Sequence, residues 1–137
     1  MKQDYDFSKK EVYVTKKFSF SAAHQLSGSS KHHDQLHGHN YTVNVTLKGS
    51  LDNNGFLVNL DNLETLIYTH VIYRLDNSFL NDYLKPLNPT VEILALYLYH
   101  EIETCLRICD YTANLKIAEI TVYETDSYSA TIRETNL

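Results

Sequence analysis

Two long stretches with a period of two, separated by a polar loop, constrain the fold of this chain most strongly. The even positions from 12 to 24 read Val, Val, Lys, Phe, Phe, Ala and His, and the odd positions from 37 to 47 read His, His, Tyr, Val, Val and Leu. This alternation is typical of β-strands, because successive side chains on a strand point to opposite faces. The intervening segment QLSGSSKHHDQL is polar and too long for a tight turn. We therefore predict strands at 12–24 and 37–48, paired as an antiparallel hairpin.

The remaining segments predict two helices and two further strands. Residues 60–74 have helical spacing, and a second helix follows the N-P-T segment at 88–90, where Thr90 can cap the first turn. The apolar stripes of the two helices are Leu60, Leu63, Ile67 and Val71, and Leu94, Leu98, Ile102, Cys105 and Cys109. Alternation returns from 118 to 124, and residues 129–133 form a short fourth strand. The order ββααββ predicts an α+β fold, with both helices on one face of a four-stranded antiparallel sheet.

The composition argues against several classes of partner. A length of 137 residues fits a single domain over 1–137, in which residues 1–11 are expected to be a loosely ordered extension. The chain has 17 acidic and 12 basic side chains, a net charge of −5, and no long basic run, which argues against a nucleic-acid surface. The start MKQDYDFSKK lacks the apolar stretch of a signal peptide, and no apolar run is long enough to span a membrane. We therefore expect a cytoplasmic protein with neither nucleic-acid nor membrane partners.

Three of the seven histidines meet in the predicted hairpin. His24 ends the apolar face of one strand, and antiparallel pairing brings it beside His37 and His39, which share a face because they are two residues apart. Three neutral nitrogen ligands without an evident fourth protein ligand are typical of a zinc ion that keeps one position for water or substrate. A catalytic Zn²⁺ is therefore the favoured interpretation. A histidine-rich turn without a metal is the alternative that the spacing leaves open.

Seven short segments occur in the order and spacing of one protein family. They are F-S-F-S-A-A-H at 18–24, L-H-G-H-N-Y at 36–41, N-G-F-L-V at 54–58, R-L-D at 74–76, L-N-D at 80–82, N-P-T-V-E at 88–92 and Y-E-T at 123–125. On these motifs, which span the chain from about Val12 to Glu134, the sequence resembles the 6-pyruvoyl-tetrahydropterin synthase and 6-carboxytetrahydropterin synthase family. The resemblance implies the tunnelling fold, in which the sheets of several subunits join into a barrel. The implied assembly is a homo-oligomer, usually a hexamer made of two trimers, with active sites between subunits.

The resemblance also assigns roles to individual residues. The family's zinc ligands correspond to His24, His37 and His39. Its pterin anchor corresponds to Glu124, whose carboxylate can accept two parallel N–H groups from the amino-pyrimidinone edge of a pterin. Thr90 and Glu92 of the N-P-T-V-E segment are implied as further substrate contacts. For Glu92 the alternative is a structural role as an acidic residue in the first turn of a helix.

The chain departs from the family at the catalytic positions. Carboxy-forming members carry a catalytic cysteine four residues before the first histidine of H-G-H, where this chain has His33. The family's Asp-His pair after the first helix reads Asp76 and Asn77 here, and an asparagine cannot titrate. Cys105 and Cys109, expected to be small core residues, lie too late in the chain to replace the missing thiol.

Two residues of the polar loop are candidates for the missing base, His33 itself and Asp34. Some family members carry a glutamate at the position of Asp34 and shorten dihydroneopterin triphosphate to 6-hydroxymethyl-dihydropterin for folate synthesis. A loop that is merely solvated is the structural alternative. Asp76 is retained as a further catalytic candidate.

The predicted function is a zinc-dependent lyase that acts on the side chain of 7,8-dihydroneopterin triphosphate or a related dihydropterin. One alternative is the retro-aldol reaction that forms 6-hydroxymethyl-dihydropterin. Another is a non-catalytic paralogue that binds a pterin without turning it over.

Overall fold

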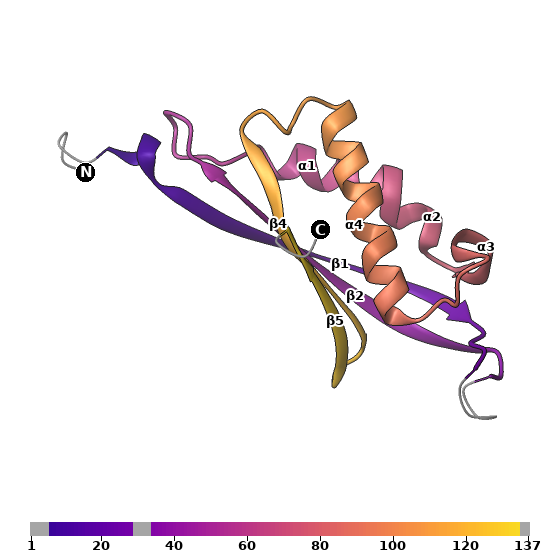
Figure 1. Ribbon diagram of the computed structural model, residues 1–137. Helices are drawn as coiled ribbons and strands as arrows, with labels where there is room; N and C mark the ends of the chain where they lie inside the picture. The colour runs from indigo at the N-terminus through magenta and orange to yellow at the C-terminus, as the bar shows by residue number, and fades with distance from the viewer. Residues whose placement is uncertain (1–5, 29–33, 135–137) are drawn as a thin grey trace.

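The hairpin predicted from the alternation forms the centre of the molecule (Figure 1). The structure, a computed structural model, describes residues 6–28 and 34–134. Strand β1 (Glu11–His24) pairs with β2 (His37–Ser50) in an antiparallel register that runs from Glu11 opposite Ser50 to His24 opposite His37. The core residues of the pair are Phe18, Phe20, Ala22, Tyr41, Val43, Val45 and Leu47. The predicted period of two is thus confirmed, with even positions of β1 and odd positions of β2 facing the core.

Residues 6–10 precede this hairpin and include a short 3₁₀ turn, η1 (Phe7–Lys9). The carboxylate of Asp6 caps this turn by accepting the backbone N–H of Ser8 at 3.0 Å. From the sequence, residues 1–11 are expected to form a loosely ordered extension, and residues 1–5 of it lie outside the described residues.

The sheet contains one strand more than the sequence predicts. Its order is β3-β1-β2-β4-β5, where β4 (Leu115–Thr125) and β5 (Tyr128–Arg133) continue the antiparallel pairing from β2. Strand β3 (Ser78–Phe79) pairs parallel to the end of β1. The prediction of a purely antiparallel, four-stranded sheet was therefore wrong at this edge, because a strand of two residues is too short to show a period.

Strand β4 begins at Leu115, earlier than predicted, because a bulge at Ala118 interrupts the period of two and hides the first part of the strand. Glu119 pairs with Thr46 and Ile117 pairs with Leu47, which leaves Ala118 without a partner on β2. One extra residue in a strand reverses which positions face the core. The predicted alternation therefore fails at Ala118.

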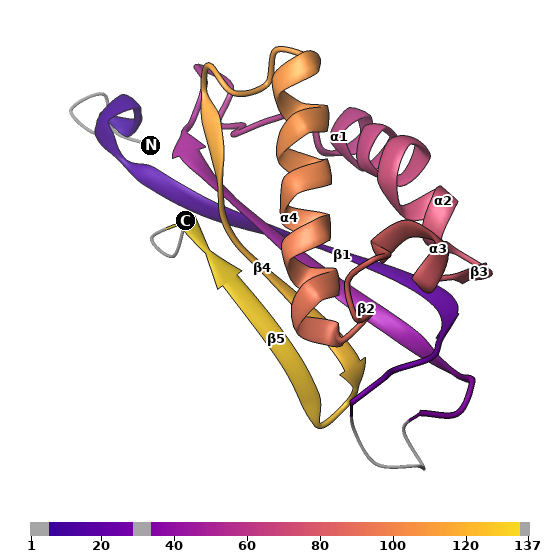
Figure 2. The same ribbon diagram turned by 45° about the vertical axis from the view of Figure 1, so that its right-hand side comes forward.

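The helices cover one face of the sheet, as predicted (Figure 2). The expected helix at 60–74 is a continuous helical segment of three parts: α1 (Leu60–Ile67), the π-helical turn η2 (Tyr68–Ile72) and α2 (Tyr73–Leu75). The wide π turn accommodates one extra residue, and both Val71 and Ile72 are buried.

The second predicted helix is α4 (Val91–Ile108), and its N-cap is Thr90, whose hydroxyl accepts the N–H of Ile93 at 3.1 Å. A short helix, α3 (Asn81–Leu84), was not predicted. Among the described helices, none is both long and apolar enough to cross a membrane.

Gly49 of β2 is expected to tolerate no side chain. A Cβ atom there would overlap the backbone carbonyl of Asn114 and lie 2.7 Å from the Leu57 side chain. Gly49→Ala should therefore reduce the free energy of unfolding by about 1–3 kcal/mol, measured by urea denaturation at a fixed protein concentration. Gly38→Ala is the matched control, since its Cβ would meet its nearest atom at 3.4 Å. Equal midpoints for the two variants would contradict this packing.

Candidate functional site

Three histidine rings converge at the end of the hairpin. His24 and His37 face each other across β1 and β2, and His39 lies opposite Ala22 on the same face. One ring nitrogen from each histidine can be chosen so that the three atoms lie within 4.8 Å of one another. His24 is fully buried, whereas His37 and His39 are half-buried. The structure thus brings together the three residues predicted as zinc ligands.

Backbone carbonyl groups orient two of these rings. The Nδ1 atom of His24 lies 2.9 Å from the carbonyl oxygen of Pro89, and that of His37 lies 2.8 Å from the carbonyl oxygen of Gln35. A carbonyl can only accept, so each Nδ1 carries a proton, and in the neutral imidazole Nε2 then carries the lone pair. The two Nε2 atoms lie 3.0 Å apart. Two lone pairs at this distance repel each other unless a cation or a proton lies between them.

The third ring also presents a free nitrogen. Among the described residues, the buried Nε2 atom of His39 has no hydrogen-bond partner. Nitrogen ligands at about 2.0–2.1 Å from a tetrahedral zinc would lie about 3.3 Å apart, close to the observed separation of the His24 and His37 nitrogens. The donor set therefore fits a divalent transition metal, and imidazole ligands suit zinc, copper, iron and nickel alike.

Burial keeps the first of these rings neutral. Desolvation lowers the pKa of His24, although the Pro89 carbonyl and the Glu124 carboxylate act in the opposite direction. A neutral imidazole is the form that binds a metal. The phenol of Tyr41, also buried, packs edge-on against His24 and His39, with ring centres 6.3 and 5.7 Å apart. Burial and the nearby Glu124 charge raise the pKa of Tyr41, so it remains a neutral wall of the site.

Tyr41 was not predicted as part of the site. The signal was present, however, because it continues the odd-numbered face of the strand that carries His37 and His39.

A pocket of about 490 Å³ lies beside the triad and contains every residue that was predicted to bind substrate. Its lining residues are Leu26, Ser27, Gly28, His37, Asn88, Thr90, Val91, Glu92, Glu124 and Tyr128. Glu92 is exposed in the first turn of α4, where an acidic residue is also favoured by the helix dipole. Glu92 thus lines the pocket and also occupies the first turn of α4.

Glu124 sits at a second irregularity of β4. Tyr123 pairs with Ser129 and Thr125 pairs with Tyr128, which leaves Glu124 without a partner on β5. Bulges of this kind redirect a side chain and occur often beside active sites. The Glu124 side chain is 20% exposed, and its Oε1 lies 3.8 Å from Nε2 of His39. Its Oε2 lies 4.0 Å from Nε2 of His24, so the carboxylate adjoins the triad directly.

The three predicted catalytic residues have different outcomes. His33 lies outside the described residues. Asp34 is half-buried, and its Oδ1 atom is buried without a hydrogen-bond partner among the described residues. Asp76 accepts the backbone N–H of Ser21 at 2.9 Å and does not line the pocket that contains His37. The structure therefore does not bring Asp76 to the triad within one chain.

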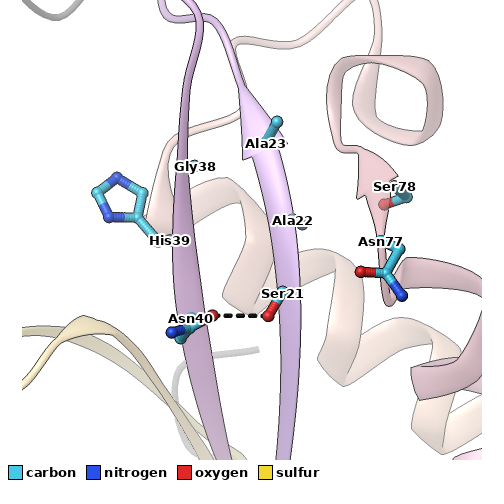
Figure 3. A pocket seen from close by; sticks show the side chains of 8 residues that line it. All are labelled: Ser21, Ala22, Ala23, Gly38, His39, Asn40, Asn77 and Ser78. Atoms are coloured by element: carbon cyan, nitrogen blue, oxygen red, sulfur yellow. Dashed lines mark hydrogen bonds between the residues drawn. The ribbon is translucent and has the colours of Figure 1, made fainter.

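A second pocket, of about 440 Å³, lies at the end of the β1–β2 pair where β3 joins it, and His39 is one of its lining residues (Figure 3). Ser21 and Asn40 line it and share a hydrogen bond of 2.6 Å. Asn77, at the position where the resemblance implies a histidine, also lines it, and its φ of 60° lies in the left-handed region. Figure 3 places the His39 ring and the Asn77 side chain on opposite sides of the β1–β2 pair.

The cysteines do not line the pocket beside the triad. Cys105 is buried in α4, as expected. Cys109 is exposed, so its prediction as a core residue was wrong, because the helix ends at Ile108 and Cys109 caps it.

The fold and the site define an α+β protein with a histidine triad beside an acid-lined pocket. The sequence profile of the 6-pyruvoyl tetrahydropterin synthase family matches residues 13–135. A 6-pyruvoyl tetrahydrobiopterin synthase of Drosophila melanogaster is 30% identical over 129 residues, covering 79% of this chain and 74% of the relative. A 6-carboxy-5,6,7,8-tetrahydropterin synthase of Bacillus subtilis (strain 168) is 36% identical over 98 residues, covering 68% and 66%.

A solved structure extends this similarity to the fold. The 6-pyruvoyl tetrahydropterin synthase of Caenorhabditis elegans superposes with a TM-score of 0.77 at 24% identity, covering 93% of this chain and 99% of that one. The chain belongs to the 6-pyruvoyl tetrahydropterin synthase family. It is accordingly an enzyme of the lyase class to which the named synthases belong.

Proposed function

We propose that this protein is a zinc-dependent lyase that acts on the side chain of 7,8-dihydroneopterin triphosphate or a closely related dihydropterin. The observation that carries the proposal is the meeting of the three imidazoles with the Glu124 carboxylate, which lines a pocket together with His37. A ligand anchored by Glu124 would have its reacting side chain beside the triad. That arrangement suits chemistry in which the ring is held and the side chain reacts.

Glu124 supplies recognition in this proposal. Its half-buried carboxylate is a double acceptor, which matches the two N–H donors on the amino-pyrimidinone edge of a pterin. His24, His37 and His39 would hold the zinc through Nε2 atoms, two of them fixed by backbone carbonyls. When bound, zinc supplies a Lewis acid that lowers the pKa of the side-chain hydroxyl groups of the substrate.

Asp34 and His33 are the proposed proton acceptors. The Oδ1 atom of Asp34 is buried and accepts no hydrogen bond within the described chain, so its capacity to accept a proton or a hydrogen bond is unused. This observation favours the second candidate reaction, retro-aldol cleavage to 6-hydroxymethyl-dihydropterin, which the resemblance connects with an acid at this position. That cleavage also requires less proton transfer than the carboxy-forming rearrangement.

We further propose that the enzyme works in the cytoplasm as a homo-oligomer, a hexamer built from two trimers. In the described chain, β5 pairs only with β4, and β3 covers only two residues of β1. Open strand edges of this kind are removed when subunit sheets close into a barrel. In such an assembly Asp76 and Asn77 would serve a neighbouring copy rather than their own triad.

We expect weak or absent formation of 6-carboxytetrahydropterin by the native chain. Turnover of dihydroneopterin triphosphate should fall by about 10²–10⁴-fold in Asp34→Ala or in His33→Ala, because a positioned base contributes a factor of this size. The products should be separated by chromatography, with Asp61→Asn on α1 as the control.

A His33→Cys, Asn77→His double variant should gain the carboxy product, and histidine tolerates the left-handed backbone of residue 77. An ordinary rate of carboxy-product formation that neither alanine variant slows would refute this account.

A further inference from the structure

The chain beyond β1 is held by side chains rather than by a strand. Asn81 accepts the backbone N–H of Gln25 through Oδ1 at 2.9 Å and donates from Nδ2 to the carbonyl of Gln25 at 2.9 Å. Asn88 makes the same pair of bonds to Ser27, at 3.0 and 2.7 Å. Each amide therefore reproduces the two hydrogen bonds that a paired strand would supply. The bonds recur at every second residue, as in a sheet.

These bonds continue a row that begins within β1. The N–H of Asn77 donates to the carbonyl of Ser21 at 2.6 Å, and that of Leu80 donates to Ala23 at 2.8 Å. Hydrogen bonds of this kind thus hold the backbone at every second residue from Ser21 to Ser27. Its partners all come from the connection between the helical segments, which lies more than fifty residues away in the sequence.

The two asparagines are connected to the carbonyl groups that orient the histidines, Asn88 through the chain itself and Asn81 through Gln25. Asn88 precedes Pro89, whose carbonyl accepts Nδ1–H of His24. On the other side, the side chain of Gln25 donates to the backbone carbonyl of Asp34 at 3.1 Å. Asp34 precedes Gln35, whose carbonyl accepts Nδ1–H of His37.

The segment that the asparagines hold also forms one wall of the pocket beside the triad. Leu26, Ser27 and Gly28 line that pocket. Movement of this segment would therefore change the shape of the pocket as well as the orientation of the rings.

We propose that Asn81 and Asn88 are positioning residues: they fix the pocket wall and, through Gln25 and Pro89, the carbonyl groups that orient His24 and His37. This inference rests on the proposed function of the same site. Neither asparagine is a catalytic residue, because both ends of each amide are engaged with the backbone. Partners that orient metal-bound histidines typically change metal affinity or activity by about 10–100-fold when they are replaced.

An aspartate at either position is the sharpest test. It keeps the shape and the acceptor of asparagine but has no donor, so it places a carboxylate against the carbonyl of Gln25 or Ser27. Asn81→Asp and Asn88→Asp should each lower zinc affinity by about 10-fold, measured by competition with a chelator. They should also shift the visible spectrum of the cobalt(II)-loaded protein, which reports ligand orientation. Asn62→Asp, the same change on the exposed side of α1, should do neither.

The readouts separate this inference from the proposed function. Native protein that binds neither zinc nor 7,8-dihydroneopterin would overturn the proposed function. Suppose instead that the native protein binds both ligands. If the aspartate variants then match Asn62→Asp in zinc affinity, cobalt spectrum and dihydroneopterin affinity, the positioning role alone is overturned. If the aspartate variants do not fold, Gln25→Leu decides, because it keeps the backbone bonds and removes only the bond to Asp34. An unchanged cobalt spectrum in Gln25→Leu would then contradict the proposed link to His37.

Discussion

Replacing His39 with alanine is expected to remove the metal from the protein. Native protein should contain close to one zinc ion per chain, and His39→Ala should contain almost none after dialysis, because two remaining imidazoles bind zinc weakly. The measurement is elemental analysis of the purified protein. His100→Ala is the matched control, since that histidine is exposed on α4.

His39 is a better choice than His24 for this experiment. Its Nε2 atom has no hydrogen-bond partner among the described residues, so the substitution should change metal binding more than stability. His24 is fully buried and bonded to Pro89, so its removal would create a cavity and leave a buried carbonyl without a donor. A stoichiometric metal content in the His37→Ala, His39→Ala double variant would end the assignment of the triad as a metal centre.

The second large effect is expected at Glu124. Glu124→Gln keeps the shape of the side chain but turns one acceptor into an N–H donor that faces the N–H groups of the pterin. Binding of 7,8-dihydroneopterin should therefore weaken by about 2–4 kcal/mol, which is about 30- to 900-fold in the dissociation constant. Calorimetric titration measures this change, and elemental analysis should show that the zinc stays. The control is Glu119→Gln on the same strand, where the carboxylate pairs with Arg133 at 3.0 Å.

An unchanged affinity in Glu124→Gln would place the anchor elsewhere. Glu92 is then the next residue to replace, because it lines the same pocket. If zinc is lost together with affinity, the carboxylate supports the metal rather than the ligand, as its distances of 3.8 and 4.0 Å from the His39 and His24 nitrogens would permit.

The sequence by itself determined the hairpin and the meeting of the three histidines. The period of two assigns His24, His37 and His39 to one face, and antiparallel pairing then leaves little choice about where they meet. The cap at Thr90 was also predictable, because it depends on neighbouring residues, and the placement of the helices on one face followed from the order ββααββ. Local patterns of this kind are written directly in the order of residues.

The tertiary structure alone decided how the site is supported. The carbonyl groups of Pro89 and Gln35, the unpaired position of Glu124 on β4 and the amide bonds from Asn81 and Asn88 have no periodic signal. A carbonyl is present in every residue, and a bulge depends on the register of two strands rather than on either sequence alone. The asparagines act on segments more than fifty residues away. Such contacts exist only once the chain has folded, because packing brings the two segments together and the single sequence carries no local record of their distance.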